Sequence, residues 1–210
     1  MRNVIIKTVL IVVTLLAVLQ TIAKSENKEK MDTKKIEQFI DRHEIEQLMY
    51  RHARSLDRMD AELMKSTYWP EAIEELEDNI TGTFQWEDKA WDFVPLAMKG
   101  FENFKVTQHR VSNILTELDG DKANTETYIM AYHVYTDENG VDQEYILGAR
   151  SLYKLEKRNG EWKIMNRSTI LDWNINQPAT ANWSDKFTDK FRPHRGDMKD
   201  DSYNYIKGKK

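Results

Sequence analysis

The second half of the chain is a series of four strand-like runs separated by tight turns. The runs all lie after residue 106 and are rich in β-branched and aromatic residues: HRVSNILTEL, ANTETYIMAYHVYT, YILGARSLYKLEKR and EWKIMNRSTILDW. The segments DGDK, DENG and RNGE between them contain the Asp, Asn and Gly that hairpin turns require. Strands joined by such short turns pair antiparallel, so the sequence predicts an antiparallel sheet from about residue 107 onward.

The part of the chain before this sheet follows a helical period instead. Apolar side chains recur at helical spacing over about 35–58, which predicts a first helix. Asp60 is a good N-cap for a second short helix, AELMKSTYW, which Pro70 would stop. A short strand or loop is expected over about 71–87, and AWDFVPLAMKGFENFK predicts a third helix. Helices followed by hairpin-linked strands predict an α+β domain with a curved antiparallel sheet.

Residues 1–23 have the layout of a secretory signal peptide. Arg2 and Lys7 flank the start of a long apolar run, and Thr21 and Ala23 suit cleavage after Ala23. We therefore expect export, to the periplasm or outside the cell, with no stable membrane insertion after cleavage. An uncleaved N-terminal membrane anchor is the alternative, because about 20 apolar residues span a bilayer. That alternative would make the protein a tethered interaction domain.

The remaining segments predict one domain with polar flanks. Residues 24–34 are charged and read as a linker, 35–175 form the domain, and 176–210 form a polar tail. The chain has no cysteine, so no disulfide can stabilise it. Its formal charge of −4 becomes −6 without Arg2 and Lys7, and this acidic balance argues against nucleic acid as a partner.

Asp57 stands near the C-terminal end of the first predicted helix, where the helix dipole disfavours a negative charge. Seven residues separate it from Tyr50, so the two side chains lie about 20° apart on the flank of the apolar stripe. A local rule broken in this way often marks a functional site. The alternatives are a solvated helix-end charge for Asp57 and core packing with a peripheral hydroxyl for Tyr50.

Three strings in the sequence point to a family. LMYRHARSLDRMD, TQHRVSNILTELDGDKANTETY and GARSLYKLEKRNGEWKIMNRSTILDW resemble, in this order, SnoaL-like proteins of the nuclear transport factor 2-like superfamily. The resemblance covers about 36–173. It implies a cone-shaped curved antiparallel sheet wrapped around N-terminal helices, with one deep interior pocket. Members of the family include dehydratases, isomerases, polyketide cyclases and dehydrochlorinases, while many others only bind ligands.

The resemblance also implies a catalytic pair. The dehydratase and dehydrochlorinase branches have an aspartate at the end of helix one and a histidine at the start of the strand after helix three, which match Asp57 and His109. A histidine held by a carboxylate can abstract a proton from carbon or from a hydroxyl. Tyr50, at a position where the family often has Tyr, would polarise the substrate. Glu71 and Ser151 depart from the family pattern, where Asp and Tyr are commoner, and these departures bear on substrate choice.

Further residues are expected to bind the substrate. Strand alternation places Asn113 on the same face as the catalytic histidine, although a strand-end cap is the alternative. His133 would be the second pocket histidine of the dehydratases. Trp91 would wall the pocket mouth or, equally, pack in the core.

Arg150 is the last candidate for substrate binding. The favoured alternative is structural, with Arg150 or Arg167 paired to Asp172, because buried charges are usually paired. The sequence has no metal-ligand spacing and no Gly-rich phosphate loop, so we expect neither a metal nor a cofactor. These features together predict an exported, cofactor-free lyase or isomerase, such as a dehydratase, that acts on a small apolar or aromatic molecule and forms a homo-oligomer. A non-catalytic ligand-binding or scaffolding domain is the alternative.

Overall fold

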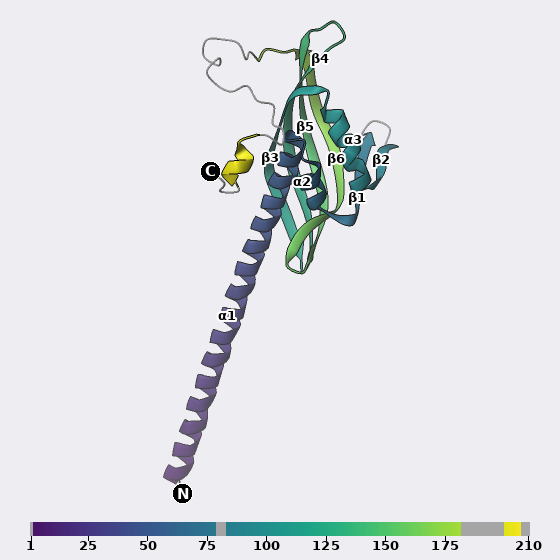
Figure 1. Ribbon diagram of the computed structural model, residues 1–210. Coiled ribbons are helices and arrows are strands. Elements are labelled where there is room, and N and C mark those ends of the chain that lie inside the picture. Colours follow the sequence, from purple (N-terminus) through teal and green to yellow (C-terminus); the bar gives the residue numbers. More distant parts are fainter. Residues whose placement is uncertain (1, 79–82, 182–199, 207–210) are drawn as a thin grey trace. The chain divides into compact units, whose positions relative to one another are not determined.

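The computed structural model describes residues 2–78, 83–181 and 200–206 (Figure 1). The chain divides into two compact units, Met1–His43 and Glu44–Lys210. Helix α1 (Arg2–Asp57) contributes to both units. Among the described residues, no helix is long and apolar enough to cross a membrane. Cleavage of the leader stays a prediction.

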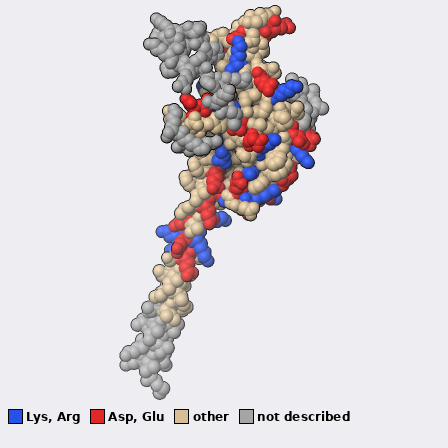
Figure 2. All heavy atoms as spheres, in the orientation of Figure 1, with Lys and Arg blue, Asp and Glu red and all other residues tan. Residues whose placement is uncertain are grey.

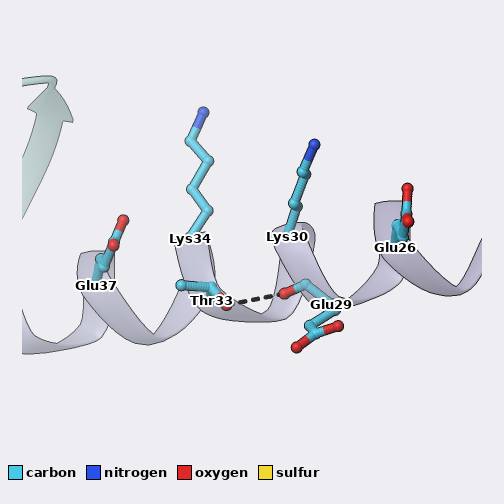
Figure 3. A pocket seen from close by; sticks show the side chains of 6 residues that line it. All are labelled: Glu26, Glu29, Lys30, Thr33, Lys34 and Glu37. Atoms are coloured by element: carbon cyan, nitrogen blue, oxygen red, sulfur yellow. Dashed lines mark hydrogen bonds between the residues drawn. The ribbon is translucent and has the colours of Figure 1, made fainter.

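The first unit is the N-terminal part of α1. Residues 24–34, expected as a linker, are helical. Figure 3 shows this stretch, in which the Thr33 hydroxyl donates a 2.9 Å hydrogen bond to the Glu29 carbonyl one turn earlier. Glu26 and Lys30 are four residues apart, the spacing at which opposite charges support a helix. The hollow between these charged side chains is lined by one helix alone, so it does not form a binding site.

The second unit is an α+β domain that begins with the last part of α1. Its helices and strands follow in this order: α2 (Ala61–Ser66), β1 (Tyr68–Asp78), β2 (Thr83–Lys89), α3 (Ala90–Phe101), β3 (Phe104–Asp119), β4 (Lys122–Thr136), β5 (Asp142–Arg158), β6 (Glu161–Pro178) and α4 (Ser202–Ile206). Asp60 caps α2 as predicted, because its side chain accepts a 2.9 Å hydrogen bond from the Leu63 N–H. The helix ends at Ser66, earlier than predicted, and the chain is already in β1 when it reaches Pro70.

The six strands form one curved, unclosed sheet in the order β2-β1-β6-β5-β4-β3 (Figure 1). The four strands from β3 to β6 pair antiparallel with their chain neighbours, as the turn segments predicted. Asn159 and Gly160 in the last turn both have positive φ, 53° and 81°, which is typical of a two-residue hairpin loop.

The expected purely antiparallel sheet is wrong in one respect, because β1 pairs parallel with β6 and the sheet is mixed. Strand β6 lies between β1 and β5 in the sheet. It runs antiparallel to β5 and in the same direction as β1. The local period of a sequence cannot specify such a pairing between segments far apart in the chain. The α+β class and the curved sheet are confirmed.

The core lies between the helices and one face of the sheet. Large side chains of α1, α2, α3, β1, β5 and β6 are fully or almost fully buried there, among them Ile45, Leu48, Met64, Tyr68, Val94, Tyr153, Leu155, Trp162 and Ile164. Burial of one such side chain contributes about 1.5–3 kcal/mol. This packing fixes the end of α1 against the sheet. On the face shown in Figure 2, acidic and basic side chains of this unit are intermixed.

Candidate functional site

The end of α1 is a tight cap that directs Asp57 into the interior. Met59 adopts a left-handed conformation with φ of 52°. Its N–H bonds the Leu56 carbonyl at 3.2 Å, and the Asp60 N–H bonds the Ser55 carbonyl at 2.9 Å. This pair of bonds is the Schellman arrangement, which usually has Gly at the left-handed position. It reverses the chain directly after Asp57, whose side chain is buried against β3.

The Asp57 carboxylate is bound by β3. The His109 N–H lies 3.0 Å from both carboxylate oxygens, and His109 Nδ1 lies 2.7 Å from Oδ1. The Thr107 hydroxyl lies 3.5 Å from the same oxygen. A carboxylate at a helix C-terminus is unfavourable, and these donors compensate for it. The alternative of a solvated helix-end charge is therefore wrong for Asp57.

The contact determines the tautomer of His109. A carboxylate only accepts hydrogen bonds, so Nδ1 must be the donor. The neutral imidazole then has its lone pair on Nε2, and the ring lines the interior cavity. The arrangement can accept a proton at Nε2, and the carboxylate would stabilise the resulting imidazolium.

The cavity beside His109 has a volume of about 540 Å³. Its walls are mainly apolar and come from α1, α2, α3 and the inner face of the sheet. The lining residues are Leu56, Met64, Leu76, Phe93, Leu96, Ala97, Gly100, Phe101, Phe104, His109, Ile129, His133, Leu147, Ala149, Arg167 and Thr169. A space of this size with few polar groups suits one small organic molecule.

His133 lies in this cavity, as the family resemblance implied. The residue is only 3% exposed, and its ring stacks on Phe104 with centroids 4.5 Å apart. The His109 ring is 5.3 Å away. Burial, and then the nearby His109, lower the pKa of His133 to about 3. Its buried Nδ1 has no hydrogen-bond partner among the described residues. His133 is therefore a neutral polar group close to the base.

Arg167 is a cavity residue that the sequence analysis did not assign to the site. Its Nη1 bonds the fully buried Glu74, whose other oxygen accepts a 2.8 Å hydrogen bond from the Tyr68 hydroxyl. Burial opposes the charge on Arg167, but the Glu74 carboxylate outweighs burial and raises the pKa of Arg167. The guanidinium thus stays charged inside an apolar cavity. The sequence did contain a signal for this residue. Glu74 in β1 and Arg167 in β6 are opposite charges within strand sequences, where they can form a buried pair.

Tyr50 does not reach the cavity, so its expected role there is wrong. The side chain is 41% exposed, and its hydroxyl donates a 2.7 Å hydrogen bond to Glu46, which raises the pKa of Tyr50. Tyr50 and Asp57 share a direction around the helix axis. However, seven residues at about 1.5 Å each separate them by about 10 Å along it.

Trp91 and Asn113 also lie away from the cavity. The cavity face of α3 contains Phe93, Ala97 and Phe101, and Trp91 lies two residues before the first of these, on the opposite side of the helix. Trp91 instead donates a 3.2 Å hydrogen bond to a carbonyl of α2. Asn113 has φ of 48° and is exposed at a bulge in β3, which interrupts the alternation that would have turned it inward.

Arg150 is structural, as the favoured alternative predicted. Leu147 and Ala149 of β5 line the cavity, so Arg150 points from the opposite face of the sheet. Its Nη2 lies 3.0 Å and its Nε 3.1 Å from Oδ1 of Asp172. Its assignment as a substrate-binding residue is therefore wrong, and Arg167 is the arginine of the cavity.

Comparison with known proteins shows the family of this chain. The SnoaL-like domain matches residues 37–168. Hexachlorocyclohexane dehydrochlorinase LinA-type3 from Novosphingobium barchaimii is 16% identical, with a TM-score of 0.59 over 70% of this chain and 96% of that chain. The Kfla4162 protein from Kribbella flavida is 17% identical, with a TM-score of 0.58 over 65% and 93%.

Rv3472 of Mycobacterium tuberculosis, a protein of unknown function, is 19% identical, with a TM-score of 0.54 over 72% of this chain and 84% of that chain. No curated protein matches the chain. Similarity at these identities shows the fold alone. The domain match, however, covers more than half of the 210 residues. The chain therefore belongs to the SnoaL-like family of the nuclear transport factor 2-like superfamily.

Proposed function

We propose that this protein is a cofactor-free lyase, such as a dehydratase, or an isomerase, with His109 as its base. The observation that supports this most is the 2.7 Å contact between Asp57 Oδ1 and His109 Nδ1 at the wall of an apolar cavity. A protein that only binds apolar ligands needs no buried carboxylate there. Desolvating a charge is unfavourable, so a function that uses it is the better account.

In the proposed reaction, Nε2 of His109 takes a proton from a C–H bond of the substrate. The electron pair of that bond forms a double bond to the adjacent carbon, and a leaving group departs from that carbon with its own electron pair. In an isomerisation, the imidazolium returns the proton to a different atom instead. Asp57 stabilises the imidazolium in both cases.

Two further cavity residues support the departure of a leaving group. Arg167 carries a positive charge that would stabilise negative charge on an oxygen or a halogen. His133, neutral over the physiological range, can donate a hydrogen bond without competing for the proton. The walls contain Phe93, Phe101 and Phe104, which suit a small apolar or aromatic substrate.

A deuterium screen tests the reaction although the substrate is unidentified. A mixture of small molecules is incubated with the protein in D₂O and analysed by mass spectrometry. We expect a compound that gains deuterium, or that loses water or a hydrogen halide, with the unaltered protein and with Tyr50→Phe. The same compound should remain unchanged with His109→Gln. A compound that stays bound to the protein but does not change in mass would instead support the ligand-binding alternative.

We also propose that the protein is exported and that it forms a homo-oligomer. The charged start and apolar run of residues 1–23 support export, and N-terminal sequencing of the mature protein should begin near Lys24. Apolar side chains exposed on the outer face of the sheet support a homo-oligomer, among them Tyr128, Met130, Leu152 and Trp173. Light scattering during size-exclusion chromatography measures the assembly directly.

A further inference from the structure

The described C-terminal residues 200–206 contact the C-terminal end of α1, where Asp57 lies. Helix α4 and the residue Asp200 before it lie against the last turn of α1 and the turn that follows. Polar contacts and a cation–π contact link the two segments. They join Tyr203 to Asp60, Ser202 to Arg54, Asp200 to Arg58, and the Tyr203 ring to the Arg54 guanidinium.

Tyr203 binds Asp60, which belongs to the turn between α1 and α2. Its hydroxyl donates a 2.8 Å hydrogen bond to Oδ2 of Asp60, while Oδ1 accepts the Leu63 N–H at 2.9 Å to cap α2. Burial, and then the hydrogen bond to Asp60, raise the pKa of Tyr203 to about 12, so the hydroxyl remains a donor near neutral pH. One carboxylate thus links the C-terminal segment, the turn after Asp57 and the start of α2.

The same segment binds the side chains of two arginines that flank Asp57. Arg54 lies one turn before Asp57, the spacing at which two side chains on a helix can meet. Arg58 follows Asp57 directly, and its Nη1 lies 3.5 Å from the Asp57 backbone carbonyl, so its guanidinium is also close to that carboxylate. In the structure, Arg54 donates a 3.0 Å hydrogen bond to Ser202 Oγ, and its guanidinium lies 4.6 Å from the centre of the Tyr203 ring. Arg58 Nε lies 3.5 Å from an Asp200 oxygen. The Asp57 carboxylate keeps its contacts with β3.

We propose that Asp200, Ser202 and Tyr203 are positioning residues for the dyad: they hold the arginines and Asp60 so that Asp57 remains bound to His109. The inference rests on the proposed role of the dyad. A helix of five residues with none buried does not form on its own, so α4 depends on these contacts for its order.

Amide hydrogen exchange followed by NMR on the full chain tests the inference without a substrate. The His109 amide reports on the Asp57 contact, because it donates to both carboxylate oxygens. The amide of Leu155, a core residue of β5, reports on global opening. Tyr203→Phe removes one hydroxyl, and Asp200→Asn releases Arg58. Tyr128→Phe, the same change at a 43% exposed position of β4, is the matched control.

We expect Tyr203→Phe and Asp200→Asn each to accelerate exchange of the His109 amide by about fivefold relative to Leu155, which corresponds to roughly 1 kcal/mol. The imidazole Nδ1 proton signal of His109 should broaden in both variants, and Tyr128→Phe should change neither readout. Equal acceleration at His109 and Leu155 would show a general stabilising contact and overturn the inference, as would no change at either site. If the deuterium screen finds no reaction while His109 responds selectively, the proposed reaction fails and the positioning role stands.

Discussion

The Asp57 carboxylate is bound twice by His109, through the backbone N–H at 3.0 Å and through imidazole Nδ1 at 2.7 Å. The backbone contact does not depend on the side chain. Removing the imidazole should therefore leave the carboxylate with a partner and the turn intact. For this reason, variants of His109 can separate catalysis from folding.

We expect His109→Ala to lower turnover by roughly two to four orders of magnitude, the usual contribution of a general base. Asp57→Asn should also reduce turnover, because an amide cannot stabilise an imidazolium. Tyr50→Phe is the control and should leave turnover unchanged, since that side chain lies on the exposed surface. Steady-state kinetics on the compound found in the deuterium screen measures all three. Full activity of His109→Ala would exclude this residue as the base.

Asp57→Ala should lower the free energy of unfolding by about 1–3 kcal/mol, because the His109 N–H and imidazole lose a buried acceptor. A helix-end charge exposed to solvent would behave in the opposite way, with a gain of a few tenths of a kcal/mol. Urea unfolding followed by circular dichroism distinguishes the two. Glu62→Gln, which removes an acidic charge from the first turn of α2, is the control and should change stability only slightly.

The strands from β3 to β6 could be predicted because each strand and turn is specified by residues that are close together in the sequence. The last turn, Asn159-Gly160, specifies its hairpin by residue type alone, and the β-rich runs on either side supply the strands. The parallel pair of β1 and β6 was not predictable in this way. It depends on packing between distant segments, which no local period reports.

Within the site, predictions failed where the direction of a single side chain could not be derived from the sequence. Asn113 follows strict alternation in the sequence, but the bulge in β3 turns it outward. Arg150 and Arg167 are both strand arginines, and only their position in the strands places the second one in the cavity. The contact between Asp57 and His109 joins residues that are 52 positions apart in the chain, and only the family resemblance predicted it.

The buried pair of Glu74 and Arg167 should show strong coupling. Glu74→Gln leaves the Arg167 charge without its counter-ion, and removing one partner of such a pair costs roughly 3–5 kcal/mol. Arg167→Met should cost a similar amount, because it leaves the Glu74 carboxylate uncompensated. The double variant should lose much less than the sum of the two. Urea unfolding of all four proteins gives the cycle, and additive losses would contradict the coupling.

The stability of the protein should fall as the pH drops below about 6.5, in part because of His133. Burial, and then His109, hold the pKa of His133 at about 3, below its ordinary value of 6.5. Between these two values the unfolded chain binds a proton that the folded chain does not, so acid favours unfolding. The slope from one such group approaches about 1.4 kcal/mol per pH unit. Burial, and then the charge of Arg167, also lower the pKa of His52, which adds a contribution of the same sign.

Replacing His133 by Phe isolates its share of this pH dependence. The ring of Phe can keep the stacking on Phe104, whose centroid lies 4.5 Å from that of His133, and it does not titrate. Urea unfolding at several values between about pH 5 and pH 8 should give a shallower decline for His133→Phe than for the unaltered protein. The two curves should converge in slope above about pH 7, where His133 is neutral in both the folded and the unfolded chain. Parallel curves over the whole range would mean that His133 takes up a proton equally in both states, and would contradict its burial as a neutral group beside His109.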